Sequence, residues 1–349
     1  MDRKEQTEKM LDALIPWYEK CGRSLPWRES STPYHVWISE IMLQQTRIET
    51  VIPYYTRFLQ EIPDIKSLAE ADPEHLHKLW EGLGYYSRVR NLQDAARQIM
   101  TQFNGVFPEK YEDILSLRGV GSYTAAAIAS ICFNLPTPAV DGNVLRVMSR
   151  ITGDQRPISE EKTKKKVCSE LAEVYPSEKA GVCTQAIMEL GETVCLPNGV
   201  PDCIHCPCRE FCLSSDGSWI YFPVKEEKKA RRIEFLTFFI LRCNNHTAIR
   251  KRPSKGLLAG MWELPNCPGH LKKEEVFLKT EEWGCEPSEC IGTGTDKHIF
   301  THIEWDIRYY SVSCSRMSPE FVWVDDEQLN ITVSLPTAFR KVLIKTVNK

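Results

Sequence analysis

The feature that most constrains the fold of this 349-residue chain is a pair of glycines, Gly119 and Gly121, in the sequence LRGVGSYTAAAI at residues 117–128. Glycine lets a backbone turn tightly and come close to a ligand. The alanine-rich segment behind the pair predicts a helix, and the free N–H groups at the start of a helix favour an anion. The pattern therefore predicts two helices joined by a hairpin that grips a phosphate of a DNA backbone. An ordinary glycine-containing turn between two helices is the alternative.

Two acids accompany this hairpin. Asp141 follows Gly121 by 20 residues, in the sequence AVDGN. Glu40 lies far upstream in PYHVWISEIMLQQT, where Pro33 suits the first turn of a helix and apolar residues surround the acid at helical spacing. An apolar setting raises the pKa of a carboxyl group, so that the group can hold a proton near neutral pH and act as a general acid. The alternative is that Glu40 lies on the polar face of an amphipathic helix.

These motifs resemble the endonuclease III superfamily of DNA glycosylases, whose helix-hairpin-helix is followed by an aspartate at the place of Asp141 and whose SExxLQQT pattern contains Glu40. Members that also cut the DNA strand carry a lysine in the helix after the hairpin, and this amine forms a Schiff base with the sugar. The present chain has Tyr123 at that position, and a phenol cannot form the adduct. The resemblance therefore narrows to the monofunctional branch, the MutY-type adenine DNA glycosylases.

The resemblance implies a role for each of four residues. Two carboxylates that flank the bond between a sugar and its leaving group are the basis of glycoside hydrolysis. By this resemblance, Glu40 protonates the departing adenine and assists the incoming water, while Asp141 stabilises the sugar cation. Tyr123 and Asn143 orient these groups.

An enzyme that acts on a base in a duplex must first extrude that base from the stack, and wedging side chains offset part of the cost. Gln45 and Tyr85 are candidate wedges, and Tyr85 lies in the glycine- and arginine-containing sequence WEGLGYYSRVRN at residues 80–91. An ordinary turn with solvated arginines is the alternative for that sequence. The contacts with DNA or the adenine that the resemblance implies are Arg28, Gln45, Thr46, Tyr85, Arg88, Gly119, Gly121 and Gln185.

Four of the 14 cysteines form a group with the spacing C-x7-C-x2-C-x5-C, namely Cys195, Cys203, Cys206 and Cys212. Thiolates this close together indicate a metal centre, either a structural zinc site or a 4Fe–4S cluster. The resemblance implies the cluster, although the family spacing begins C-x6-C. The extra residue falls in a first loop that has no basic residue, so the phosphate contact that this loop makes in the family is in doubt here. Cys208 is interpreted as a thiol that does not bind the cluster.

The remaining cysteines are scattered, and neither a signal peptide nor another long apolar segment is evident. Both observations favour a reducing cytoplasm, which in a bacterium means the cytosol or nucleoid. The composition divides the chain into a mostly helical catalytic region at residues 1–215, with the cysteine loop at 195–212, a charged linker at 216–232 and an α+β module at 233–349. In that module we expect a β-hairpin of Glu234–Arg242 and His246–Lys251 around Asn244-Asn245, strands at Ile299–Tyr310 and Phe321–Val324, and a short final helix.

The α+β module contains the sequence GMWELP at residues 260–265, which resembles the entry to a Nudix hydrolase box. In the segment where a Nudix enzyme has its metal-binding Arg-Glu-x-x-Glu-Glu, this chain keeps Glu281 and Glu282 but has Phe277 and Leu278 at the other two positions. Pyrophosphate hydrolysis is therefore not expected. The MutY family has a non-hydrolytic Nudix-like domain that recognises 8-oxoguanine opposite the target adenine.

The reading loop of that domain is Phe-Ser-His in the family and Phe300-Thr301-His302 here. Thr301 keeps the hydroxyl group of serine and adds a methyl group, so hydrogen bonding to the lesion is retained while its fit remains open. A plain strand with an exposed histidine is the alternative.

The formal net charge of −3 gives no general support for binding to nucleic acid, because proteins that bind polyanions usually carry a basic face. Two other functions were weighed: an Fe–S glycosylase that acts on thymine or uracil opposite guanine, and a non-catalytic Fe–S protein that binds DNA or carries electrons. Glu40 and the Nudix-like module argue against the first, and the presence of both Glu40 and Asp141 argues against the second. We expect a monomer that acts on double-stranded DNA containing adenine opposite 8-oxoguanine, with no membrane contact.

Overall fold

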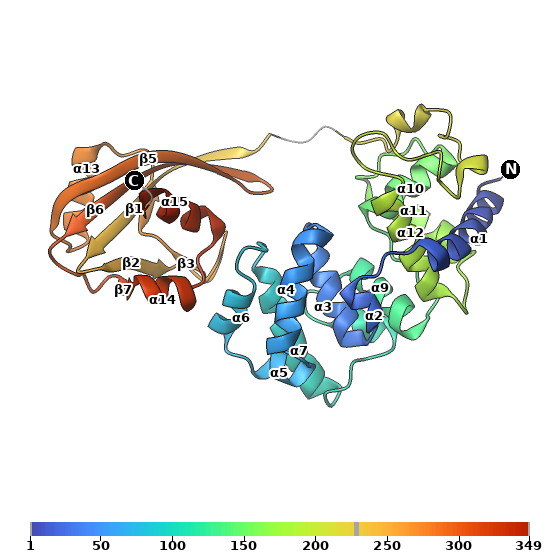
Figure 1. Cartoon of the computed structure of the whole chain (residues 1–349), viewed down its shortest axis with the longest axis horizontal. Helices are drawn as coiled ribbons and strands as arrows, with labels where there is room; N and C mark the ends of the chain where they lie inside the picture. The colour runs from blue at the N-terminus through green and yellow to red at the C-terminus, as the bar shows by residue number, and fades with distance from the viewer. Residues whose placement is uncertain (1, 227–229, 348–349) are drawn as a thin grey trace. The chain divides into compact units, whose positions relative to one another are not determined.

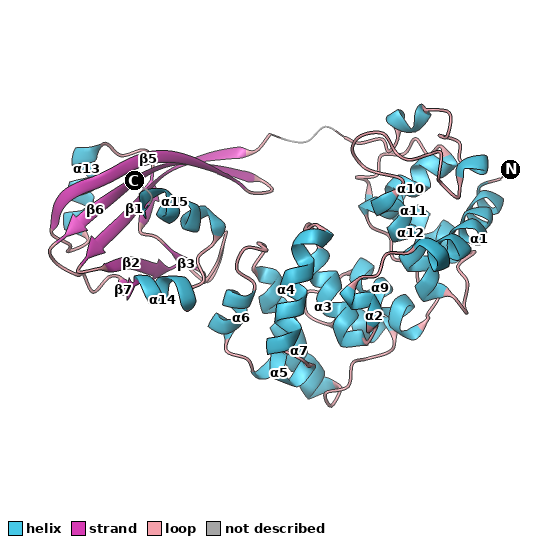
Figure 2. Ribbon diagram, viewed as in Figure 1, coloured by secondary structure: helices cyan, strands magenta, loops and turns pink. Residues whose placement is uncertain are grey.

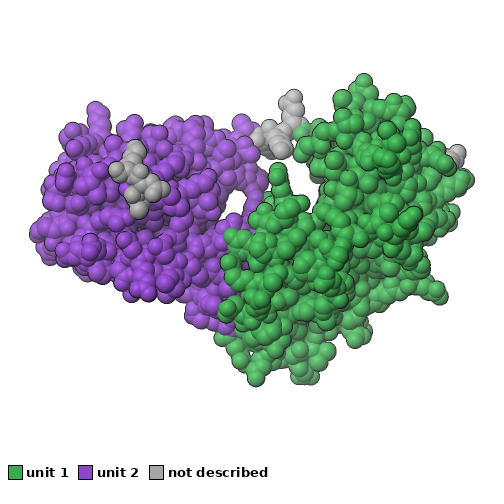
Figure 3. Space-filling view, viewed as in Figure 1, with its two compact units in different colours: residues 1–70, 91–227 green, residues 71–90, 228–349 purple. Residues whose placement is uncertain are grey.

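The computed structural model describes residues 2–226 and 230–347. The chain divides into two compact units, which Figure 3 shows in green and purple. The first contains Met1–Glu70 and Asn91–Glu227, and the second contains Ala71–Arg90 and Lys228–Lys349. The boundary between the units at residues 227 and 228 falls inside the predicted linker at 216–232, and residues 71–90 group with the C-terminal module. Residues 227–229 of the predicted linker lie outside the described residues.

The first unit is helical, as predicted (Figure 1). Its helices are α1 (Arg3–Cys21), α2 (Pro26–Glu29), α3 (Pro33–Leu43), α4 (Ile48–Glu61), α5 (Ile65–Glu70), α8 (Tyr111–Ser116), α9 (Ser122–Phe133), α10 (Gly142–Thr152), α11 (Glu161–Ala172) and α12 (Ala180–Thr193), followed by the 3-10 turns η1 (Arg209–Phe211) and η2 (Ser218–Tyr221). Helix α7 (Ser87–Gln102) begins in the second unit and continues into the first.

One core of this unit forms where α1, α10, α11 and α12 meet. Met10, Leu11 and Leu14 of α1 are buried there, as their helical spacing predicts. They pack with apolar residues of α10 and α12 and with Cys208 of the cysteine loop. The cysteine loop is therefore anchored to the same core that fixes α10 and α12.

The predicted hairpin joins α8 to α9. Gly119 has a φ of +76°, and a Cβ atom there would come within 2.5 Å of Asn91 Cβ, so this position requires glycine. Gly121 has an extended backbone with a φ of −94° and open space beside it, so its conformation does not require glycine. It caps the N-terminus of α9 and leaves the first N–H groups of that helix open to an approaching anion.

The second unit is built on a mixed sheet flanked by helices (Figure 2). Its elements are α6 (Pro73–Leu79), β1 (Arg232–Cys243), β2 (His246–Lys251), β3 (Trp262–Glu263), β4 (Asn266–Pro268), α13 (Lys273–Glu282), β5 (Pro287–Ile299), β6 (Ile303–Cys314), β7 (Val322–Asp325), α14 (Asp326–Ile331) and α15 (Thr337–Val347). The main strand order is β3-β2-β1-β6-β5, with β4 paired to β1 and β7 paired to β2. Only the β1–β6 pairing among these described strands is parallel.

The sheet is buried on both faces because successive residues of a strand point to opposite sides. In β1, Phe238 and Ile240 pack with Phe339 and other residues of α15, while Phe239 and Leu241 pack with Val276 of α13. The module is therefore three layers thick, with a nearly continuous apolar sequence in its central strand.

Residues 71–90 belong to the second unit because polar contacts fix them to it. Glu81 accepts a hydrogen bond from Arg340 Nη2 at 2.8 Å, and Ser334 Oγ donates to the carbonyl of His77 at 3.0 Å. Trp262 Nε1 donates to Glu74 at 2.9 Å. This segment follows α5 in the chain but takes its tertiary contacts from the C-terminal module.

The predicted β-hairpin is confirmed: β1 and β2 are joined by Asn244 and Asn245, which adopt positive φ angles of 47° and 62°. The predicted strand at Ile299–Tyr310 is wrong at its start, because Phe300, Thr301 and His302 form the turn between β5 and β6. Strand β5 was not predicted, because its small and polar residues lack the apolar alternation on which strand prediction depends.

No helix in the described part of the chain is long and apolar enough to cross a membrane.

Candidate active site

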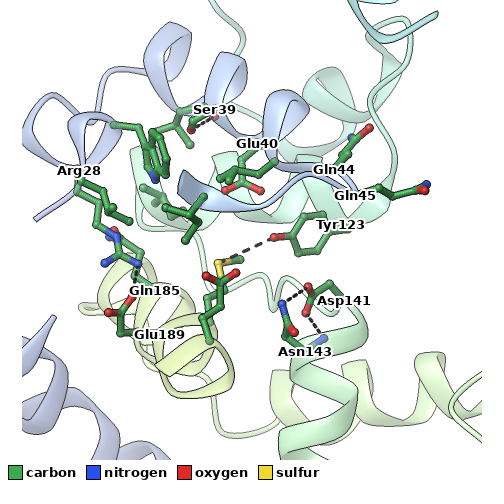
Figure 4. A pocket seen from close by; sticks show the side chains of 18 residues that line it. Arg28, Ser39, Glu40, Gln44, Gln45, Tyr123, Asp141, Asn143, Gln185 and Glu189 are labelled. Carbon is green, nitrogen blue, oxygen red and sulfur yellow. Dashed lines mark hydrogen bonds and ion pairs between the residues drawn. The ribbon is translucent and has the colours of Figure 1, made fainter. Parts of the chain in front are cut away.

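A cavity of about 360 Å³ opens in the first unit between α2, α3, α9, α10 and α12 (Figure 4). This volume is within the roughly 300–1,000 Å³ that is usual for small-molecule sites. The lining residues are Leu25, Trp27, Arg28, Val36, Ser39, Glu40, Leu43, Gln44, Gln45, Ile48, Tyr123, Ile131, Asp141, Asn143, Gln185, Met188, Glu189 and Glu192. The cavity thus brings together the two acids that are 101 positions apart in the sequence.

Glu40 is buried on the inner face of α3. This helix begins as the sequence predicts, with Pro33 in its first turn and the Thr32 side chain accepting a hydrogen bond from the N–H of His35. Only 7% of Glu40 is exposed. Burial raises its pKa to about 7; a hydrogen bond from Tyr123 opposes the increase, and the negative charge of Asp141 adds to it. Glu40 can therefore hold a proton at neutral pH and release it inside the cavity.

Asp141 is held by hydrogen bonds at the start of a helix, because it is the N-cap of α10. Its Oδ1 accepts hydrogen bonds from the backbone N–H groups of Asn143 at 2.9 Å and Val144 at 2.8 Å. Its Oδ2 accepts a third bond from Asn143 Nδ2 at 3.2 Å. Burial raises the pKa of Asp141, but these backbone bonds and the charge of Arg146 favour the ionised form. The N-terminal end of the helix dipole also favours a negative charge here.

Tyr123 lies in the first turn of α9, between the two acids (Figure 4). Its hydroxyl donates a long hydrogen bond to Met188 Sδ at 3.9 Å and lies beside Glu40, and burial raises its own pKa well above the usual value, so it remains a neutral phenol. Asn143 is oriented from behind, because its Oδ1 accepts a hydrogen bond from Arg146 Nη1 at 2.9 Å. Both residues lie where they can orient a carboxylate.

Arg28 and Gln185 form part of the cavity wall, and protein contacts hold both of them. Arg28 Nη2 donates to Glu189 at 2.9 Å and Nη1 donates to the carbonyl of Arg23 at 3.0 Å. Gln185 Oε1 accepts a hydrogen bond from the Tyr18 hydroxyl at 3.1 Å. These contacts make a rigid wall on that side of the cavity.

Gln45 lies at the edge of the cavity, exposed and in the left-handed backbone region with a φ of 60°. Thr46 does not line the cavity; its N–H donates to the carbonyl of Leu43, which closes the turn after α3. The Gln45 side chain is thus exposed at the edge of the cavity, whereas Thr46 stabilises the backbone turn.

Tyr85 and Arg88 lie in the second unit and also differ. Tyr85 is 45% exposed with a φ of 48°, and its hydroxyl is 3.1 Å from Thr301 Oγ1. Arg88 is buried and donates to the carbonyls of Leu83 and Gly84. We expected Arg88 to contact DNA, but its guanidinium instead supports the loop that carries Tyr85.

The predicted reading loop borders a second cavity of about 440 Å³, whose lining includes Tyr85, Phe300, Thr301 and His302. Phe300 packs edge-on against Trp305, with ring centroids 4.8 Å apart. Thr301 and His302 are exposed. The loop therefore has a fixed aromatic base and two accessible polar side chains.

The four grouped cysteines line one further cavity, together with Arg150 and Trp219. Arg150 Nη1 lies 3.3 Å from Cys195 Sγ, and Arg146 Nε donates to the Cys195 carbonyl at 2.9 Å. Cys208 is fully buried in the core and does not line this cavity. No three His, Cys, Asp or Glu side chains among the described residues are arranged to hold a metal ion.

No motif in the sequence selects Arg23, Arg146, Glu189 and Glu192. Glu189 is 1% exposed and binds both Arg23 and Arg28. Arg146 Nη2 donates to the carbonyl of Gly191 at 2.7 Å, which ties α10 to α12. Glu189 and Glu192 do lie at helical spacing in an otherwise apolar helix. This spacing indicates a functional site only once α12 is known to line the cavity.

Known proteins resemble both parts of the chain. Residues 38–176 match the family described as HhH-GPD superfamily base excision DNA repair protein, and residues 237–345 match the NUDIX domain family. The adenine DNA glycosylase of Mus musculus is 34% identical, across 94% of this chain and 76% of that protein. The adenine DNA glycosylase of Buchnera aphidicola (subsp. Baizongia pistaciae) is 30% identical, across 95% of each. A solved structure of a thermostable thymine-DNA glycosylase covers 61% of this chain and 98% of its own, with a TM-score of 0.56 at 23% identity, which shows a shared fold.

The burial of Glu40 leads to a prediction about stability. Because its pKa is higher in the folded protein, the folded state loses stability relative to the unfolded chain as pH rises from about 4.5 through about 7. Glu40→Gln has no proton to lose there. Its stability relative to the parent should therefore increase across this range by up to about 3 kcal/mol. Thermal unfolding at acidic and at alkaline pH measures the difference.

The matched control is Glu49→Gln, which removes an exposed carboxylate from α4. Its stability relative to the parent should change little with pH. An advantage of Glu40→Gln that is the same at both pH values would contradict the assigned burial.

Proposed function

This chain belongs to the adenine DNA glycosylase family, and from that premise we propose that it removes adenine from double-stranded DNA by hydrolysis of the N-glycosidic bond. The observation that carries the proposal is the single cavity shared by a buried, protonatable Glu40 and by Asp141, whose carboxylate accepts two backbone hydrogen bonds as the N-cap of α10. Two carboxyl groups held in opposite protonation states are what the cleavage of a sugar–base bond requires.

In the proposed reaction, Glu40 donates its proton to the ring of the extruded adenine as the bond to the sugar breaks. The sugar gains positive charge, and the carboxylate of Asp141 stabilises it. Water then adds to the sugar carbon while Glu40 accepts a proton from that water, which restores the acid. The products are free adenine and an abasic site, and no other reactant is needed.

Tyr123 limits the reaction to base removal. It occupies the position from which a lysine would attack the sugar, and a buried neutral phenol cannot form a Schiff base. We propose that its hydroxyl, which lies beside Glu40, instead orients the acid. We therefore propose a monofunctional glycosylase that leaves the strand intact.

Extrusion of adenine is assigned to the residues around the two cavities. Gln45 and Tyr85 are exposed, which suits side chains that enter a base stack. Gly119 and the start of α9 provide backbone N–H groups for a phosphate. Arg28 and Gln185 form the wall that faces the adenine, and Thr46 shapes the turn behind Gln45.

For the C-terminal module we propose recognition of 8-oxoguanine opposite the adenine. The support is the exposed pair Thr301 and His302 beside an aromatic base formed by Phe300 and Trp305. The hydrogen bond between Thr301 and Tyr85 connects the loop proposed to recognise 8-oxoguanine with the side chain proposed to enter the base stack. Hydroxyl and imidazole groups can bond to the edge of the lesion while Tyr85 stacks.

We propose that Cys195, Cys203, Cys206 and Cys212 hold a 4Fe–4S cluster; the support is that all four thiols line one cavity beside an apolar core. The cluster would act as a crosslink that fixes the loop to α10 and α12. All 14 cysteines are free of disulfides, which favours a reducing compartment. Both catalytic acids come from one chain, so a monomer is sufficient.

The proposed roles of the two acids are tested by Glu40→Gln and Asp141→Asn. Each should bind duplex DNA as the parent does. Glu40→Gln should lose on the order of 10²- to 10⁴-fold in single-turnover adenine release, because it lacks the general acid, and Asp141→Asn should also be severely impaired. The assay uses duplexes with adenine opposite 8-oxoguanine, adenine opposite guanine and thymine opposite guanine, followed by alkali to cut abasic sites.

Glu173→Gln, an exposed change on the same unit, is the control and should retain the parental rate. A parent that released thymine and not adenine would overturn the proposed substrate. Parental rates in either acid variant would remove that acid from the mechanism.

Recognition of the lesion is tested by replacing Thr301 and His302 together with alanine. Because the pair is proposed to read 8-oxoguanine, the variant should lose the preference for adenine opposite 8-oxoguanine over adenine opposite guanine. Thr293→Ala, an exposed change in β5 outside the loop, is the control. Unchanged discrimination by the double variant would count against the loop.

The cluster is tested by comparing Cys206→Ser with Cys208→Ala. The parent should contain about four iron atoms per chain and show Fe–S absorbance. Cys206→Ser should lose both, while Cys208→Ala should keep both because Cys208 does not line the cavity. Stoichiometric zinc in place of iron would rule out the proposed cluster.

A further inference from the structure

The catalytic cavity contains a third carboxylate, Glu192, to which the proposed reaction gives no role. Glu192 lies in the last turn of α12 and lines the cavity with Glu40 and Asp141. Its side chain is 36% exposed. It is therefore in contact with whatever occupies the cavity edge.

The position of Glu192 is electrostatically unfavourable. The C-terminal end of a helix carries partial negative charge, so an acid in the last turn is destabilising. Glu189 lies one turn earlier on the same face, and like charges three residues apart repel each other. A residue that costs stability in two ways beside the reaction site calls for a functional explanation.

Arg23 fixes Glu192 in this position. Its Nη2 donates to Glu192 Oε2 at 3.2 Å, while its Nε and Nη2 donate to the two oxygens of Glu189 at 2.6 and 3.1 Å. One guanidinium is thus shared between two carboxylates. Arg28 also binds Glu189, so two guanidinium groups serve the two carboxylates, and Glu192 has the longest of these contacts.

The groups that face Glu40 come from four helices: Tyr123 and Cys132 from α9, Asp141 from α10, Glu192 from α12 and Arg28 from α2. Asp141 and Glu192 are the two carboxylates in this set. Asp141 is committed to capping α10 and, in the proposed reaction, to the sugar. Of these two carboxylates, only Glu192 has a negative charge to which the proposed reaction assigns no role.

We propose that Glu192 is a positioning residue of the proposed glycosylase site, whose charge, fixed by Arg23, keeps Glu40 in the protonated state that departure of adenine requires. A nearby negative charge disfavours ionisation of a second carboxyl group. The charge of Glu192 is indeed among the causes that raise the pKa of Glu40. The inference rests on the proposed function and adds to it a residue that sets the pH range of activity.

The test is the pH dependence of single-turnover adenine release by the full-length protein, measured from about pH 5 to about pH 9 with saturating enzyme. Glu192→Gln keeps the shape and the Arg23 contact of the side chain but removes its charge. The alkaline decline in rate should move to lower pH by roughly half to one unit. Release should therefore be about three- to tenfold slower at pH 8 and within about twofold of the parent at pH 5.5.

Two further variants separate this effect from a loss of structure. Glu192→Asp keeps the charge and should restore the parental profile, and Glu192→Ala should behave as Glu192→Gln does. The matched control is Glu19→Gln, which removes a carboxylate paired with Lys179 on the surface of α1 and should leave the profile unchanged. Thermal unfolding and DNA binding are measured for each variant.

A Glu192→Gln profile that coincides with the parental one, or that is lower by the same factor at every pH, overturns the inference. Such a result leaves the proposed function intact, provided that the parent releases adenine and Glu40→Gln does not. A parent that releases no adenine at any pH instead defeats the proposed function.

Discussion

The chemistry assigned to this protein depends on keeping two carboxyl groups of one cavity in different protonation states. Glu40 is surrounded by buried residues of α3, and burial favours its neutral form. Asp141 faces the same cavity, but the first turn of α10 directs two backbone N–H groups at one of its oxygens. Hydrogen bonds to the charged form favour that form. Burial raises the pKa of both acids, but only at Asp141 do backbone N–H groups oppose that effect, so the proposed difference between the two acids comes from the backbone of α10.

Helix α10 also connects this difference to the rest of the first unit. One turn after Asp141, Arg146 holds Asn143 and donates to carbonyls of Gly191 and Cys195. A further turn along, Arg150 reaches the thiol of Cys195. The aspartate, the end of α12 and the first cysteine of the cluster loop are therefore fixed by one helix. This arrangement gives a physical reason for a structural cluster at a distance from the reaction, because the loop that it would crosslink also defines where α10 and α12 lie.

The sequence was sufficient for those parts of the site that are defined by local rules. The acid in an apolar helix and the glycine with positive φ at the hairpin both follow from residue type and position, and the structure buries Glu40 and gives Gly119 a φ of +76°. The sequence was insufficient where contacts between residues that are distant in the chain determine the position of a side chain or segment. Arg88 is expected from the sequence to contact DNA, but it is buried under the Tyr85 loop. Residues 71–90 are expected to belong to the helical region, but their partners are Trp262, Ser334 and Arg340. Strand β5 pairs along β6 despite a weak strand pattern, because the partner strand supplies the hydrogen bonds and the register.

Backbone strain coincides with two of the surface residues for which contact with DNA is proposed. Of the seven described non-glycine residues with positive φ, four are asparagines, which tolerate this conformation. The other three are Gln45, Tyr85 and Leu258, and each has a side chain for which the left-handed region costs on the order of 1–2 kcal/mol. Two of these are the residues assigned as wedges from sequence, and Leu258 lines the same cavity as Tyr85 and Thr301. Such strain persists only where the surrounding structure imposes it, and here it holds the proposed wedges outward before any DNA is bound. The energy needed to expose these side chains is then part of the folding free energy, and extrusion of the base does not have to supply it.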